Sequence, residues 1–345
     1  MQSGNKRGGG MNRRTLTVLA LSVTIGLSNF AQPAWSAIIV GPGVQVGTAS
    51  GLTEVSGIAV SRSLPGTIWA HQDSGDSARF YGMSTSGAIH STVTLSGRTA
   101  VDWEDMAIGP NPSGGNYIYI GDIGDNGANR NSGVDIIRLS EPTSTGNATL
   151  TSAQFQVKRV TYPGIPFLRE EDAESLFVDP LNSDLYIIQK LGQGNLFRMS
   201  ANQWNVSGTY SLQSQGSINT EANYRPTAAD ISPDGKHILV RNSSNNGTKA
   251  FLFLRDITTN QSIQSAMQST PLQITLQSEP QGESIAWAPD GSGFYSISEG
   301  SNRPVYYYSS SAVPEPSSAA LLLTSLSFMF SRRRRQVLCR NGIRQ

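Results

Sequence analysis

Glutamate occupies one position of a repeated pattern in this sequence. Five segments start with an apolar run that ends at a turn, and three of them begin with glutamate. These are Glu104, Glu174 and Glu283. Each lies six residues before a turn proline, so all three share one register. Because repeats of one structural unit place equivalent residues at equivalent points, we expect the three carboxylates to meet in space.

A second set of polar residues follows the strands that return toward the same end. Two of these strands end in Asp-x-Gly-Asp, beginning at Asp73 and Asp122, and another ends at Glu299. The remaining endings are Lys190 and Arg241 with Asn242. We expect this set to join the glutamates around the mouth of one channel, where Lys190, Arg241 and Asn242 would bind an anionic ligand.

Carboxylates that gather this closely cannot all stay charged unless a cation, a proton or a partner compensates them. Carboxylate and carbonyl oxygens, about six to eight per ion, are the ligands of calcium. The sequence therefore predicts a Ca²⁺ site. Its expected ligands are Glu104, Glu174, Glu283, Asp73, Asp122 and Glu299. Two alternatives remain open: a metal-free pocket for a polar ligand, and a solvated rim in which Asp and Gly only form turns.

Histidine offers one further candidate for chemistry. His71 lies two residues before Asp73 and is the candidate general base. The sequence has no His-x-x-x-His pair for zinc and no glycine-rich loop for phosphate. Two function classes follow. The first is a protein that binds a ligand or partner without turnover, and the second is a Ca²⁺-dependent hydrolase of phosphoesters, esters or lactones.

The elements that must position these residues are strands. The repeated segments, at 56–60, 104–108, 174–178, 227–231 and 283–287, lead through turns into aromatic-rich partners at 67–70, 117–120, 185–188, 237–240 and 294–297. β-Branched and aromatic runs between such turns are typical of strands. A two-strand unit repeated at intervals of 48 to 70 residues predicts an all-β fold. The expected fold is a β-propeller of five four-stranded blades, with six blades as the alternative.

Outer strands complete most of the expected blades. The third blade is expected to end with a strand at 210–212, and the fourth with one at 272–276. The fifth blade runs into the C-terminal segment before a fourth strand appears. Residues 38–46 are expected to supply that strand and close the ring, which would remove the unpaired sheet edge.

Two stretches resemble known families of propellers. Residues 229–236, Ala-Asp-Ile-Ser-Pro-Asp-Gly-Lys, resemble the repeat of TolB-like propellers. Asp-Trp-Glu-Asp at 102–105 and Gly-Asp-Ile-Gly-Asp-Asn at 121–126 resemble a family of secreted bacterial propellers related to the esterase-like phytase domain. The resemblance covers most of 51–310 in patches. It implies a propeller fold and leaves function open, because propellers host many functions.

The N-terminal part predicts a signal peptide. Arg13 and Arg14 precede the apolar run 16–27, and Ala34 and Ser36 supply small residues before a cleavage site. Residues 1–36 are therefore expected to be a signal peptide with a short N-terminal extension. The body at 37–311 is expected to be exported.

The C-terminal part, residues 312–345, resembles a sorting signal. Val-Pro-Glu-Pro at 313–316 precedes an uncharged stretch at 317–330 and the four arginines at 332–335. This order of elements resembles the PEP-CTERM signal. The resemblance implies a transmembrane helix before processing, an exosortase-type processing enzyme as a partner, and delivery to the cell envelope, the cell surface or the extracellular medium.

Charge and cysteine content exclude several functions. Residues 37–311 hold 16 Lys and Arg against 24 Asp and Glu, a net charge of −8 that argues against nucleic acid as a partner. An envelope polymer or a small ligand is expected instead. The one cysteine, Cys339, lies outside this body, which therefore has neither a disulfide nor a cysteine-ligated zinc site.

Overall fold

The computed structural model describes residues 38–73, 75–127, 130, 132–163, 172–190, 194–221, 224–242 and 249–312. The expected signal peptide at 1–36 and the sorting signal from residue 313 onward lie outside these residues. Strands dominate the described part of the chain, and none of its helices is long and apolar enough to cross a membrane. The helical segments there are η1 (Ala201–Asn205) and α1 (Ile263–Met267).

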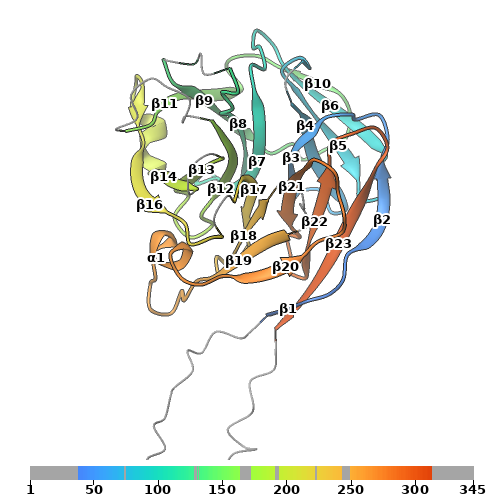
Figure 1. The fold of residues 1–345 in the computed structure, drawn as a ribbon. Helices are drawn as coiled ribbons and strands as arrows, with labels where there is room; N and C mark the ends of the chain where they lie inside the picture. The colour runs from blue at the N-terminus through green and yellow to red at the C-terminus, as the bar shows by residue number, and fades with distance from the viewer. Residues whose placement is uncertain are drawn as a thin grey trace, which may run out of the picture. The chain divides into compact units, whose positions relative to one another are not determined.

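The strands form five sheets, and each is one blade of a β-propeller (Figure 1). The first blade runs outward through β3 (Val55–Val60), β4 (Thr67–Gln72), β5 (Arg79–Ser84) and β6 (Ile89–Leu95). The second runs through β7 (Trp103–Pro110), β8 (Asn116–Asp122), β9 (Val134–Ser140) and β11 (Phe155–Thr161). Two short strands pair in parallel with the outer ones, β10 (Ala148–Leu150) with β6 and β15 (Tyr210–Ser211) with β11.

The other three blades follow the same antiparallel order. The third contains β12 (Ala173–Val178), β13 (Leu185–Gln189), β14 (Asn195–Met199) and β16 (Gln213–Ser217). The fourth contains β17 (Pro226–Ile231), β18 (His237–Asn242), β19 (Lys249–Leu254) and β20 (Leu272–Thr275). The fifth contains β21 (Gly282–Trp287), β22 (Gly293–Ser298) and β23 (Arg303–Ala312).

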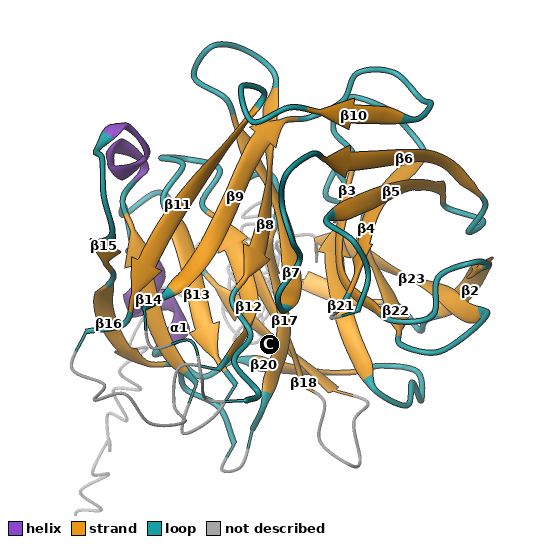
Figure 2. Ribbon diagram, turned by 90° about the horizontal axis from the view of Figure 1, so that it is seen from above, coloured by secondary structure: helices purple, strands orange, loops and turns teal. Residues whose placement is uncertain are grey.

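The five innermost strands form a closed cycle. β3 contacts β7, β7 contacts β12, β12 contacts β17, β17 contacts β21, and β21 contacts β3 again. Figure 2 shows these strands gathered at the centre, with the outer strands of the first, second, third and fifth blades beyond them. The cycle leaves no gap for a sixth blade, so the prediction of five blades is confirmed.

An apolar core fills each interface between neighbouring blades. Trp69 and Trp103 lie in the core between the first and second blades, and Trp287 lies in the core between the fourth and fifth. Because each inner strand is buried on both faces, its residues after the first two or three positions are mostly apolar and do not alternate with polar ones. This is why the inner strands could be recognised from the sequence.

The N-terminal segment closes the ring, as predicted. β1 (Ile38–Val40) and β2 (Val44–Ala49) both pair antiparallel with β23. Ile38 lies opposite Ala312, and Val44 lies opposite Tyr307. The fifth blade is therefore completed by strands from the other end of the described chain.

The prediction for the outer strand of the third blade is wrong. Tyr210 and Ser211 pair with β11 of the second blade, and the third blade ends with β16. Leu212 belongs to the core between these two blades. The apolar character at 210–212 therefore comes from filling an interface. The true outer strand, Gln-Ser-Gln-Gly-Ser, is polar and mostly exposed, so it gave no apolar signal.

Candidate functional site

Each innermost strand carries a β-bulge at the repeated position. The pairing with the second strand shifts between Trp103 and Asp105 in β7, and between Ala173 and Ser175 in β12. The same irregularity occurs in β3, β17 and β21. The residues passed over are Ser56, Gly57, Glu104, Glu174, Thr227 and Glu283. A bulged residue is left unpaired and its side chain is re-aimed, so the repeated glutamates share a structural cause for their orientation.

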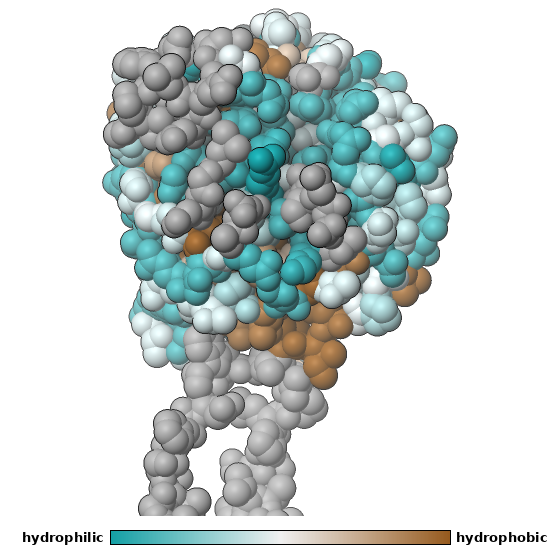
Figure 3. All heavy atoms as spheres, viewed as in Figure 1, coloured by the Kyte–Doolittle hydropathy of each residue, from teal (hydrophilic) through white to brown (hydrophobic). Residues whose placement is uncertain are grey.

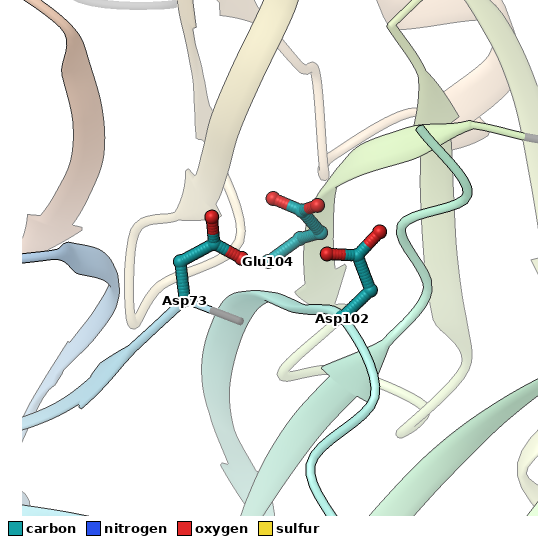
Figure 4. Close-up of side chains that lie close together, drawn as sticks. All are labelled: Asp73, Asp102 and Glu104. Carbon is teal, nitrogen blue, oxygen red and sulfur yellow. The ribbon is translucent and has the colours of Figure 1, made fainter. Parts of the chain in front are cut away.

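Two groups of carboxylates form around Glu104. Asp73, Asp102 and Glu104 make one group, and Glu104, Asp172 and Glu174 make the other. Within each group, one oxygen per residue lies within 4.8 Å of the others. Figure 4 shows the carboxylates of the first group facing one another. Glu104 belongs to both groups, and we refer to the five residues together as the acidic mouth.

The shared carboxylate is buried and incompletely bonded. Glu104 is 4% exposed and Glu174 is 3% exposed. Glu104 Oε1, Glu174 Oε2 and Asp73 Oδ1 have no hydrogen-bond partner among the described residues. Leaving a buried polar atom unpaired costs about 1–3 kcal/mol, and more when the group is charged. The acidic mouth therefore lacks compensation that a cation or bound protons would supply.

Burial and mutual repulsion raise the proton affinity of the acidic mouth. Burial, followed by the charges of Asp73 and Asp102, raises the pKa of Glu104 well above its usual value. Burial, followed by the charge of Asp73, raises the pKa of Asp102 to about 6. Near neutral pH these carboxyls compete for protons, and a bound cation would displace those protons.

The pKa values of two further predicted residues, Glu283 and Glu299, are also raised, and the charge of Asp73 contributes. Burial, followed by Glu283 and Glu54, raises the pKa of Glu299 to about 7. Burial also raises the pKa of Glu283, although the charges of Lys190 and Arg241 oppose the rise. Asp73 contributes to both shifts. Glu283 and Glu299 therefore lie beside the acidic mouth, outside its two groups.

Lys190 brings a positive charge to the acidic mouth. It directly follows β13, and its Nζ forms an ion pair with Glu174 Oε1. Its charge also opposes the burial-driven rise in the pKa of Glu104 and of Glu299. One ammonium cannot neutralise five carboxylates, so an excess of negative charge remains.

Asp122 stabilises the loop that carries Asp102. Its carboxylate is fully buried and pairs with Arg130 Nη1 at 2.7 Å. It also accepts the Asp102 N–H at 3.1 Å. Asp122 therefore holds the loop that presents Asp102, and it belongs to neither acidic group.

Because Gly124 has no side chain, the carboxylates of Glu104 and Asp102 can lie close to its backbone. A Cβ atom at this position would lie 2.1 Å from Glu104 Oε1 and 2.6 Å from an oxygen of Asp102. The next residue, Asp125, donates its backbone N–H to Asp172 Oδ1 at 3.0 Å. The Asp-Ile-Gly-Asp run after β8 thus builds one wall of the site with its backbone.

The structure gives Arg241 and Asn242 partners within the fold. Arg241 is fully buried, pairs with Glu279 at 3.0 Å and donates to the Ser284 carbonyl oxygen at 3.1 Å. It therefore ties the fourth blade to the fifth. Asn242 accepts the Arg225 N–H at 3.3 Å. Lys190, in contrast, contacts the acidic mouth directly through its ion pair with Glu174.

His71 is enclosed in the fold. Its ring packs edge-on against Trp103 at 5.5 Å, and its Nδ1 lies 3.1 Å from the Gln72 carbonyl oxygen. Gly57 leaves room for Nε2, because a Cβ there would come within 2.3 Å of it. Burial lowers the pKa of His71. The structure therefore places this candidate base in the interior, at no exposed surface.

Asp102 and Asp172 were not among the predicted site residues, although the sequence contains a pattern that could have indicated them. Each lies two residues before a repeated glutamate, in Asp102-Trp103-Glu104 and Asp172-Ala173-Glu174. The middle residue starts β7 or β12. The aspartate is therefore the last loop residue and the glutamate is the bulged one, a relationship that only the strand boundary reveals.

The donor atoms favour a hard divalent cation. Both acidic groups consist of carboxylates alone, without histidine or cysteine. Oxygen ligands suit Ca²⁺ and Mg²⁺, whereas zinc and copper favour nitrogen or sulfur. The residues of the acidic mouth therefore fit an alkaline-earth cation, with Glu104 available to either group.

Comparison with known proteins yields a structural likeness and no functional relative. No protein-family model matches the sequence, and no curated protein matches it. Among solved structures, the chain is similar to hydrazine synthase from Kuenenia stuttgartiensis, with 13% sequence identity and a TM-score of 0.38. The match covers 72% of this chain and 57% of the hydrazine synthase chain. Because it spans little more than half of that protein at low similarity, nothing about the present site follows from it.

Proposed function

We propose that this chain is an exported β-propeller of the cell envelope that binds Ca²⁺ at the acidic mouth and uses it to hold a ligand or partner. The observation that carries the proposal is the Glu104 carboxylate. It is 4% exposed, belongs to both acidic groups and has an oxygen without a hydrogen-bond partner among the described residues. A cation would pair that oxygen and offset the repulsion among the five carboxylates.

Calcium suits this set of ligands better than magnesium. Ca²⁺ accepts about six to eight oxygens in a flexible geometry, whereas Mg²⁺ prefers a strict octahedron and retains several waters. Each acidic group offers three carboxylates from two neighbouring blades, and the flexible geometry of Ca²⁺ suits such an irregular set. Extracellular modules commonly bind Ca²⁺ in the range of about 0.1–1 mM, and an affinity of this order would serve an exported protein.

The ligand or partner that the bound Ca²⁺ holds would carry an acidic group, which both an envelope polymer and a small molecule can offer. A cation at Glu104 and Glu174 competes with Lys190 Nζ for Glu174 Oε1. The Lys190 side chain is 21% exposed, so a released ammonium could turn toward an anion. Charge-assisted hydrogen bonds of this kind are among the stronger polar contacts in proteins.

Export and sorting complete the proposal. Residues 1–36 would direct secretion, and an exosortase-type enzyme would process the segment 312–345 after the apolar stretch 317–330 has entered the membrane. Ile38 pairs with Ala312, so the signal peptide and the sorting signal would both be attached at the same edge of the propeller. The acidic mouth is built from residues of the first three blades, so processing at the edge of the fifth blade would leave it unchanged.

Titration calorimetry of the full chain with CaCl₂ tests the cation site. The wild type should bind Ca²⁺ and melt at a higher temperature in its presence, because a ligand selective for the folded state adds about 2.7 kcal/mol at one hundred times its Kd. Glu104→Gln should lose both effects. The matched control is Glu221→Gln, because Glu221 pairs with Lys249 at an exposed position at 3.3 Å and should respond to Ca²⁺ like the wild type.

A wild type whose melting temperature ignores Ca²⁺ would contradict the cation site. A metal-free pocket for a polar ligand would then be the better interpretation. Loss of the response in Glu221→Gln as well as in Glu104→Gln would mean that Ca²⁺ acts through general surface charge.

A Ca²⁺-dependent hydrolase of phosphoesters, esters or lactones is the second candidate, because of Glu299. Burial, followed by Glu283 and Glu54, raises its pKa to about 7, so its carboxyl can take up or release a proton near neutral pH. Ca²⁺-dependent turnover of p-nitrophenyl phosphate, p-nitrophenyl acetate or a lactone, lost in Glu299→Gln, would establish this activity. Absence of turnover with all three would leave the binding function.

A further inference from the structure

A groove without charged residues lies between the outer strands of the fourth and fifth blades. Its volume is about 610 Å³. Ile38 and Val40 of β1 line one side, and Leu272, Ile274 and Leu276 at β20 line the other. The remaining lining residues are also uncharged. A groove of this composition selects an apolar ligand, because a polar one would lose hydrogen bonds to water without replacing them.

Apolar side chains are exposed around this groove. Ile39 is 58% exposed, Val44 is 57% exposed and Leu272 is 44% exposed. Figure 3 shows the corresponding brown surface where β1 and β20 lie in Figure 1. Among the strands of the described residues, β20 ends its sheet and pairs with β19 alone, so within this part of the chain its outer edge has no partner strand. Contiguous exposed apolar surface of this kind marks an interaction site.

The chain itself supplies a nearby apolar segment. Ala312, the last described residue, pairs with Ile38 of the groove wall. Val-Pro-Glu-Pro follows in the sequence, and four residues can span at most about 14 Å. The uncharged stretch Ser-Ser-Ala-Ala-Leu-Leu-Leu-Thr-Ser-Leu-Ser-Phe-Met-Phe, at 317–330, comes next. This stretch therefore starts within a short tether of the groove.

We propose that the groove binds residues 317–330 of the same chain and shields them from water until they are delivered to the membrane. A short tether keeps the segment at an effective concentration on the order of millimolar, which favours it over free apolar ligands. Fourteen residues would make a helix of about 21 Å. The hydrocarbon core of a bilayer is about 30 Å thick, so the segment is short for a membrane span and gains from an alternative apolar partner.

Disulfide trapping in the full chain, without lipid, tests the proposal. The background is Cys339→Ser, which removes the one native thiol. Leu272→Cys is combined with Leu322→Cys, and the matched control combines Ile89→Cys with Leu322→Cys. Ile89 is 37% exposed on β6 of the first blade and is not among the residues that line the groove, so its thiol would be similarly accessible at another blade. Mild oxidation should form the intramolecular disulfide at least about tenfold faster from position 272, a rate ratio equivalent to about 1.4 kcal/mol.

A second measurement keeps the test independent of disulfide geometry. Maleimide should label the single Leu272→Cys variant slowly, and about tenfold faster when Leu321→Ser, Leu322→Ser and Leu323→Ser are added, a ratio equivalent to about 1.4 kcal/mol. Labelling of the Ile89→Cys variant should not change. Equal oxidation rates from positions 272 and 89, together with equal labelling, would overturn the proposal. Disulfides between two copies would identify a second chain as the occupant, and protection that requires added vesicles would identify the bilayer; both results would also overturn it.

Discussion

The carboxylates of Glu104 and Glu174 have oxygens within 4.8 Å of each other, although the two residues belong to different blades. Lys190 Nζ forms an ion pair with Glu174. Glu104 Oε1 has no hydrogen-bond partner among the described residues. The two glutamates are equivalent in the repeat and unequal in their compensation, and this inequality makes Glu104 the expected centre of cation binding.

Replacing Lys190 should strengthen Ca²⁺ binding and weaken the Ca²⁺-free protein. In Lys190→Met, Glu174 loses its ion-pair partner, so repulsion within the acidic mouth grows and the melting temperature falls. The same change removes the competitor for Glu174, so the Kd for Ca²⁺ should fall about tenfold, equivalent to about 1.4 kcal/mol. Titration calorimetry and thermal melts with and without Ca²⁺ measure both effects.

The control for this variant is Lys249→Met. Lys249 pairs with Glu221 at an exposed position, where ion pairs contribute about 0–1 kcal/mol, so both measurements should match the wild type. A weaker Ca²⁺ affinity in Lys190→Met would contradict competition and show that the ammonium helps to hold the bound cation's other ligands.

Gly124→Ala should weaken cation binding without unfolding the propeller. The added methyl would lie 2.1 Å from Glu104 Oε1, so the carboxylate must move. The fold should persist because the displaced atoms are ends of side chains. We expect the Ca²⁺ affinity to fall at least about tenfold, or about 1.4 kcal/mol. Val101→Ala, at a nearby residue that is 54% exposed, is the control. Unchanged affinity in Gly124→Ala would place the cation away from Glu104.

Asp230 should make stability depend on pH between about 4 and 6. Burial raises its pKa from 3.8 to about 6, although the Trp287 N–H donates to its carboxylate at 2.7 Å. Within this window the folded state holds a proton that the unfolded state releases. The stability that Asp230 contributes therefore falls as the pH rises through the window and is constant above it, by about 3 kcal/mol in all.

Urea unfolding of Asp230→Asn across this pH range checks the assignment. The variant should lose this part of the pH dependence, while the pH dependence from other carboxyls remains in both proteins. Curves for the wild type and the variant that stay parallel at every pH would show that Asp230 does not take up the proton.

The Glu141 carboxylate joins the first two blades and should matter for stability. It accepts hydrogen bonds from Ser61 Oγ at 2.6 Å, from Ser63 Oγ at 2.6 Å and from Trp69 Nε1 at 3.2 Å. Burial alone would raise the pKa of Glu141, but these bonds outweigh burial and hold it below its usual value. Glu141→Gln replaces one acceptor oxygen with a donor and should cost about 2–4 kcal/mol.

Urea unfolding at neutral pH measures the cost of Glu141→Gln. Glu221→Gln, an exposed glutamate with a surface ion pair, should stay within about 0.5 kcal/mol of the wild type. A similar small change in Glu141→Gln would show that water replaces the lost hydrogen bonds at the blade interface.

The register of the inner strands could be predicted because two constraints coincide in the sequence. Burial on both faces makes most residues of each strand apolar, and a turn proline marks the end of four of the five. The sequence alone therefore places the glutamates at 104 and 174 at equivalent positions, and in the structure both are the bulged residues of β7 and β12. The closing strand was predictable for a related reason, because a propeller that lacks an outer strand exposes a sheet edge.

Residues whose surroundings come from another blade could not be placed in this way. Lys190 directly follows β13, whereas Arg241 lies inside β18 opposite Ala228. Glu279 and Ser284 of the neighbouring part of the fold enclose Arg241. His71 lies two residues from Asp73 and is packed against Trp103 of the next blade. A strand end seen in sequence does not reveal what the neighbouring sheet brings against it.

By itself, the sequence determined the inner strand pairs and the equivalence of the repeated glutamates, and it favoured five blades over six, because these depend on local apolar patterning and on the spacing between turns. The tertiary structure decided which carboxylates meet. Asp102 and Asp172 join Glu104 and Glu174, while Asp122 turns to Arg130. The physical reason is that charge compensation acts over a few ångströms between blades, and such distances are set by how the blades pack and by where each bulge turns its side chain.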